Sequence, residues 1–126
     1  MSKLLRIGVL ASGGGTNLQA IIDRCQEGRL TAEIAVVITN NPGAGALDRA
    51  SSAGIKTLCI NHRDFAQRED FDHAVVDALR KNEVDLVVLA GFMRIITQTF
   101  IDAFPERIIN IHPALLPAFP GLNVQQ

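Results

Sequence analysis

The stretch Leu5-Arg-Ile-Gly-Val-Leu-Ala-Ser-Gly-Gly-Gly-Thr-Asn17 joins a short apolar run to a glycine-rich turn, and this order decides the fold. The run Leu5–Ala11 is typical of a buried strand. After the turn, apolar residues recur at the spacing i, i+3, i+4 and i+7; they are Leu18, Ile21, Ile22 and Cys25. This spacing predicts an amphipathic helix that ends near Gly28. A strand, a tight turn and a helix in this order form the first part of a βαβ unit.

The same alternation continues along the rest of the chain. Strands are predicted at residues 34–39, 57–60, 84–89 and 107–111, and helices at 44–53, 68–82 and 97–104. This pattern indicates an α/β fold with a doubly wound, mostly parallel sheet. In such a sheet the first strand is central, and the strand order reverses between the first and fourth strands. The loops at residues 12–16 and 90–94 are therefore expected to face the same crevice.

Composition favours one soluble domain over residues 1–126. Apolar residues make up 48% and charged residues 20%, which suggests strands covered on both faces. The formal net charge of −1 gives no basic field for nucleic acid. The apolar stretch at residues 7–11 is too short for a signal peptide, and no segment approaches the roughly 20 apolar residues that span a membrane. We therefore predict a cytoplasmic protein without nucleic-acid or membrane partners; the oligomeric state stays open.

Neither cysteine, nor the histidine at position 73, is predicted to take part in catalysis or metal binding. Cys25 and Cys59 lie far apart in apolar stretches and lack a CxxC partner. We interpret both as reduced core residues, and we predict no metal site. His73 falls on the side of its predicted helix opposite the apolar residues, so we expect it at the surface.

The glycine-rich turn at residues 12–17, Ser-Gly-Gly-Gly-Thr-Asn, predicts an anion site. It lies between a strand and a helix, where unpaired amides of the first helical turn face outward. Leu18 stands where a dinucleotide fingerprint has its third glycine, and the second strand ends without a carboxylate. No Gly-Lys-Ser/Thr follows, which excludes a Walker A loop. The expected ligand is a small phosphate monoester; a tight turn without a ligand is the alternative.

A second candidate site is Asn110-Ile-His-Pro-Ala-Leu-Leu-Pro117, at the end of the last predicted strand. Residues i and i+2 of an extended segment point to the same face, and Pro113 favours an extended His112. Asn110 and His112 are therefore expected in one cleft, where they can polarise a carbonyl and move a proton. The alternative is that His112 ends the strand and bonds to backbone groups.

Three segments together resemble the phosphoribosylglycinamide formyltransferase family, also called glycinamide ribonucleotide transformylase. They are Ala11-Ser-Gly-Gly-Gly-Thr-Asn-Leu-Gln-Ala-Ile-Ile22, Leu89-Ala-Gly-Phe-Met-Arg-Ile95 and Asn110-Ile-His-Pro-Ala-Leu-Leu-Pro-Ala-Phe-Pro-Gly121. The resemblance runs over the whole chain. It implies a Rossmann-like formyltransferase fold and an enzyme of de novo purine biosynthesis. That enzyme moves a formyl group from 10-formyltetrahydrofolate, its co-substrate, to the amine of glycinamide ribonucleotide, and it needs no metal.

The resemblance also implies roles for individual residues. Gly15, Thr16 and Asn17 match the positions that bind the substrate phosphate. His112 and Asn110 match the catalytic positions. The positions around the folate are matched by Arg68, Met93, Arg94, Ile95, Ile96 and Asn110.

The chain departs from the family after Gly121. The family's domain continues well beyond this motif, and its further half supplies an aspartate that pairs with the histidine. No acidic residue follows His112 here. We therefore expect these 126 residues to be the N-terminal part of a longer enzyme, lacking the C-terminal half of the domain. Such a chain is expected to bind the nucleotide weakly, to turn over poorly, and to leave its last strand exposed.

Other interpretations of the same residues remain open. Without the resemblance, Arg68 and Arg94 are surface charges, and the pair Phe92 and Met93 is core packing. A formyltetrahydrofolate deformylase or a methionyl-tRNA formyltransferase carries a similar His-Pro motif, although the phosphate turn and the lack of a basic surface argue against both. The remaining alternative is a non-catalytic module that binds a phosphorylated ligand.

Overall fold

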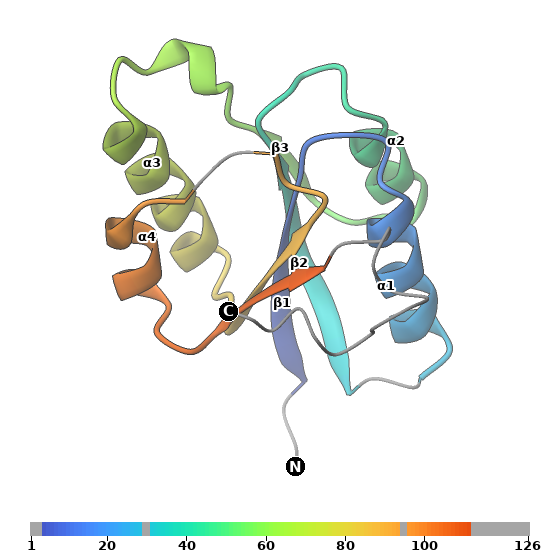
Figure 1. The fold of residues 1–126 in the computed structure, drawn as a ribbon. Helices are drawn as coiled ribbons and strands as arrows, with labels where there is room; N and C mark the ends of the chain where they lie inside the picture. The colour runs from blue at the N-terminus through green and yellow to red at the C-terminus, as the bar shows by residue number, and fades with distance from the viewer. Residues whose placement is uncertain (1–3, 29–30, 94–95, 112–126) are drawn as a thin grey trace.

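The computed structural model describes residues 4–28, 31–93 and 96–111 (Figure 1). Its elements are β1 (Leu5–Ala11), α1 (Thr16–Gln26), β2 (Ala32–Thr39), α2 (Gly45–Ser52), β3 (Thr57–Cys59), the 3-10 helix η1 (His62–Asp64), α3 (Arg68–Lys81), β4 (Leu86–Ala90), α4 (Gln98–Ala103) and β5 (Ile108–Ile111). Every predicted strand and helix is present, and their ends agree to within about two residues. The short η1 was not predicted.

The five strands form one sheet in the order β3-β2-β1-β4-β5, and all neighbouring pairs are parallel. β1 is central and the order reverses between β1 and β4, as predicted. Leu10 of β1 lies opposite Leu89 of β4, which in turn lies opposite Asn110 of β5. Parallel strands end at a common edge, so the loops after β1, β2 and β4 gather there, at the top of Figure 1.

Helices cover both faces of this sheet. α1 and α2 lie on one face, and α3 and α4 lie on the other (Figure 1). Successive residues of a strand point to opposite faces, so Val9 packs in the cluster with Leu18 of α1, while Leu10 packs in the cluster with Leu79 of α3. The three inner strands are therefore apolar on both sides. This confirms the expectation drawn from the high apolar content.

The two edge strands are less covered. At one edge, Ile109 of β5 is 47% exposed, in agreement with the predicted exposure of the last strand. At the other edge, the prediction that Cys59 lies in the core was wrong, because it ends the short strand β3 and faces solvent. Cys25 of α1 is half-buried and packs against the core between α1 and the sheet. His73 is exposed, as predicted. Among the described helices, none is both long and apolar enough to cross a bilayer.

Candidate functional site

Gly15 shapes the turn between β1 and α1. Its φ of 84° lies in the left-handed region, which costs other residues about 1–2 kcal/mol. A Cβ at this position would lie 2.8 Å from the Cα of Ala46, so a larger residue would also push α2 away. α1 begins at Thr16, and no side chain caps its first turn. The amides of that turn are therefore free to receive an anion.

Helix α2 holds the glycine turn from one side. The Ala46 amide donates to the Gly13 carbonyl at 3.1 Å, and Arg49 Nε donates to the Gly14 carbonyl at 2.7 Å. Arg49 is half-buried, and its guanidinium brings a positive charge beside the turn. Arg49 was not predicted as a site residue, because the sequence of its helix gives no local sign of a distant partner.

Ser12 connects the glycine turn to the loop after β4. Its Oγ accepts a hydrogen bond from the Met93 amide at 2.8 Å and donates one to Asn40 Oδ1 at 2.7 Å. Its own amide donates to the Gly91 carbonyl at 3.3 Å. The prediction that the loops after β1 and β4 face one crevice is therefore confirmed, and the loop after β2 joins them through Asn40.

The end of β5 also reaches the glycine turn. Asn17 in the first turn of α1 is buried, and its Nδ2 donates to the Ile111 carbonyl at 3.4 Å. Ile108 packs against the core below α3, and Ile111 packs against the core below α1. Asn110 therefore shares the face of Ile108, and it is exposed. His112, the next residue after β5, lies outside the described residues.

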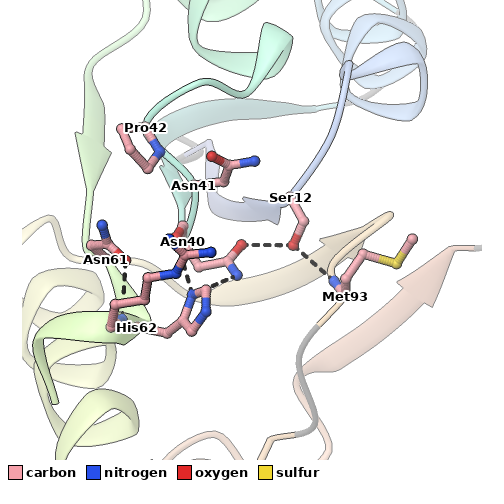
Figure 2. A pocket seen from close by; sticks show the side chains of 8 residues that line it. Ser12, Asn40, Asn41, Pro42, Asn61, His62 and Met93 are labelled. Atoms are coloured by element: carbon pink, nitrogen blue, oxygen red, sulfur yellow. Dashed lines mark hydrogen bonds between the residues drawn. The ribbon is translucent and has the colours of Figure 1, made fainter.

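A pocket of about 350 Å³ opens beside Ser12 (Figure 2). Residues from four loops line it, including Ser12, Asn40, Asn41, Asn61, His62 and Met93. His62 Nδ1 lies 3.3 Å from both Nδ2 and the carbonyl oxygen of Asn40. Met93 and the glycine turn were predicted from the sequence, whereas the asparagines and His62 were not. Their position just after β2 and β3, at the carboxyl edge of a parallel sheet, was the signal that could have found them.

Of the residues expected to contact the folate, some line the pocket and others do not. Met93 is 82% exposed and lines the pocket, whereas Phe92 and Ile96 pack against the core below α3 and α4. Arg68 begins α3, is exposed, and does not line the pocket. Arg94 and Ile95 lie outside the described residues. The structure therefore brings the glycine turn and Met93 together through Ser12, and the roles of these residues and of the arginines stay predictions.

The described part of the chain contains no group of three His, Cys, Asp or Glu side chains suited to a metal ion. The two thiols are poor nucleophiles at neutral pH. Burial raises the pKa of Cys25, and burial followed by the nearby Asp64 carboxylate raises the pKa of Cys59. The polar side chains that line the pocket or hold the turn carry hydroxyl, amide, imidazole and guanidinium groups.

Residues 5–126 match the family model described as formyl transferase. The chain belongs to this formyl transferase family. It is 46% identical over 121 residues to the phosphoribosylglycinamide formyltransferase of Haemophilus influenzae, and the match covers 96% of this chain and 57% of that protein. It is also 46% identical over 123 residues to the trifunctional purine biosynthetic protein adenosine-3 of Drosophila melanogaster, covering 96% of this chain and 9% of that protein.

Solved structures of the family share the fold. The glycinamide ribonucleotide transformylase 1 of Symbiobacterium toebii superposes with a TM-score of 0.85 at 51% identity, over 94% of this chain and 56% of that one. The phosphoribosylglycinamide formyltransferase of Coxiella burnetii gives 0.84 at 46% identity, over 96% and 57%. The predicted family and its Rossmann-like fold are confirmed. The chain spans little more than half the length of these single-enzyme relatives.

Proposed function

We propose that this domain takes part in formyl transfer from 10-formyltetrahydrofolate to the amine of glycinamide ribonucleotide. One observation carries the proposal: the glycine turn, the loop after β4 and the end of β5 are hydrogen-bonded together at the carboxyl edge of the sheet. This edge is where open α/β sheets bind ligands. The 46% identity to an enzyme named phosphoribosylglycinamide formyltransferase supports the choice of substrates.

The nucleotide phosphate would be received at the start of α1. In this proposal the amides of Gly15, Thr16 and Asn17 bind the phosphate oxygens, since a helix N-terminus carries a partial positive charge. The Arg49 guanidinium adds a full charge next to the Gly14 carbonyl. Both groups favour a dianionic monoester over a neutral ligand.

The folate and the reacting groups would lie beyond the end of β5. Met93, Ile96, Arg68 and Asn110, with Arg94 and Ile95, are the proposed folate contacts. The substrate amine attacks the formyl carbon, the bond from that carbon to the folate nitrogen breaks, and one proton moves from the amine to that nitrogen. Protonated His112 and the Asn110 amide would stabilise the oxyanion formed on the way, and the imidazole would carry the proton. No step calls for a metal.

We further propose one domain that acts in the cytoplasm on small molecules alone. The apolar N-terminal stretch forms the central strand β1, so its removal as a signal peptide would destroy the sheet. The net charge of −1 provides no field for a nucleic acid.

Single-turnover formyl transfer with excess protein tests the proposal. His112→Ala and Asn110→Ala are each expected to slow transfer by about 10² to 10³ while leaving nucleotide affinity nearly unchanged, because they remove groups that act on the oxyanion. His73→Ala, an exposed histidine on α3, is the matched control and should keep the wild-type rate. Near-normal transfer in both site variants would refute the roles. Formate release without the nucleotide would instead indicate a deformylase. Binding of both ligands without turnover would indicate either a non-catalytic module or an N-terminal fragment of the enzyme.

A further inference from the structure

Ser12 is a buried hydroxyl in the middle of the proposed site. Ser12 is 8% exposed, and its Oγ lies between the Asn40 side chain and the Met93 amide (Figure 2). The hydroxyl hydrogen is committed to Asn40 Oδ1 at 2.7 Å, which leaves an oxygen lone pair for the Met93 amide at 2.8 Å. The hydroxyl can therefore satisfy both neighbours at once only in this orientation.

Asn40 fixes that orientation. Its side chain is buried, its Oδ1 accepts from the Ser12 hydroxyl at 2.7 Å, and its Nδ2 lies 3.3 Å from His62 Nδ1. A chain of hydrogen bonds then runs from the Met93 amide through Ser12 and Asn40 to His62. This chain joins the loops that follow the strands β1, β2, β3 and β4.

Met93 depends on this bond for its position. β4 ends at Ala90, and Gly91 with a φ of 73° turns the chain away from the sheet, so Met93 has no strand neighbour. Its side chain is 82% exposed and is held by no packing in the core. The Ser12 hydroxyl is thus the described group that fixes the Met93 backbone.

The glycine turn has different supports. Ala46 and Arg49 of α2 hold the Gly13 and Gly14 carbonyls, and neither of them contacts Met93 through a hydrogen bond. Removal of the Ser12 hydroxyl therefore frees Met93 while α2 still holds the turn.

We infer that Ser12 is a positioning residue for the folate side of the site, and that Arg49 separately positions the phosphate side. The naming of these two sides rests on the proposed function. The geometric part, that the Ser12 hydroxyl fixes the Met93 backbone, stands without it. The two parts can therefore fail independently.

Amide hydrogen exchange followed by NMR tests the geometric part. Ser12→Ala is expected to speed exchange at the Met93 amide about fivefold to tenfold, the value of one net hydrogen bond. The Thr97 amide, which donates to Asp72 Oδ2 at 2.7 Å, is the internal reference and should not change. Ser12→Thr keeps the hydroxyl and should restore protection, and Ser52→Ala deletes the same atom at an exposed position of α2. Ser12→Cys, with a weaker acceptor of similar size, serves if the alanine variant does not fold.

Unchanged exchange at Met93, equal acceleration at Thr97, or no recovery in Ser12→Thr would overturn the inference. Titration with two probes then tests the division of the site. Ser12→Ala should weaken 5-formyltetrahydrofolate several-fold and spare ribose 5-phosphate, and Arg49→Ala should do the reverse. Equal losses for both probes in both variants would show that the two sides are not held separately. Failure of the wild-type chain to bind either probe would refute the proposed function while the exchange result still decides the role of Ser12.

Discussion

Asp72 offers a sharp test of how the loop after β4 is held in place. Asp72 lies on α3 and is 2% exposed. Its Oδ2 accepts hydrogen bonds from both the amide and the hydroxyl of Thr97, each at 2.7 Å. Thr97 is the residue before α4, so these bonds fasten the start of α4 to α3. Asp72→Ala would leave two donors of Thr97 without their acceptor in a part-buried position.

The size of the effect follows from those two bonds. A hydrogen bond to a charged group contributes about 1.5–3 kcal/mol, and two bonds that share one oxygen add incompletely. We therefore expect Asp72→Ala to lower the free energy of unfolding by about 2–4 kcal/mol. Urea unfolding followed by far-ultraviolet circular dichroism is the appropriate assay, because the chain has no tryptophan or tyrosine to report by fluorescence.

Two further variants make the test specific. Asp72→Asn keeps an acceptor oxygen and should recover roughly half of the loss. Asp77→Ala removes the same group from an exposed position on the same helix and should change stability by less than about 0.5 kcal/mol. A loss in Asp72→Ala no larger than that in Asp77→Ala would refute the reasoning, since it would mean that the buried carboxylate contributes nothing net.

Three other outcomes are expected. Gly15→Ala should cost about 1–3 kcal/mol in urea unfolding and weaken ribose 5-phosphate, because φ is 84° and its Cβ would meet Ala46; unchanged binding would contradict this. Leu79→Ala should cost about 2–5 kcal/mol, because the side chain is fully buried; a loss below about 1 kcal/mol would count against the described packing. The pKa of Cys59 is raised, so its alkylation by iodoacetamide, followed by mass spectrometry, should need a higher pH than that of a free cysteine, and Asp64→Asn should lower the midpoint.

The sheet could be predicted because its inner strands are buried on both faces. Such strands appear as unbroken apolar runs, and the rule of right-handed crossovers leaves few possible orders. Asp72 could not be predicted in the same way. It adjoins Phe71 on the helix, and its burial becomes tolerable only through Thr97, 25 positions later, which no helical period indicates. The prediction that Cys59 is buried was wrong because its neighbours in the sequence are apolar although its strand lies at an edge of the sheet.

The site was predictable to the extent that it is local. Glycines between a strand and a helix predict the tight turn at residues 12–17 from a few consecutive residues, and its binding of a phosphate stays a prediction. Ser12 and Asn40 are 28 positions apart, and Arg49 lies 35 positions from Gly14, so their contacts exist only after the loops converge. The roles of His112 and Asn110 remain predictions that the proposed kinetic experiment decides.

The strand order has a consequence for biosynthesis. Strand β1, which will occupy the middle of the sheet, is synthesised before the other four strands, yet Ile7 pairs with Leu86, whose synthesis comes 79 residues later. Until then, β1 can be flanked only by β2, and its other border of amides and carbonyls stays unfilled. Long-range parallel pairing of this kind forms slowly, because a large loop has to close first. During this stage the central strand of the folded domain is still an edge strand with unpaired backbone groups. Such an edge is prone to aggregation, and chaperones would bind it.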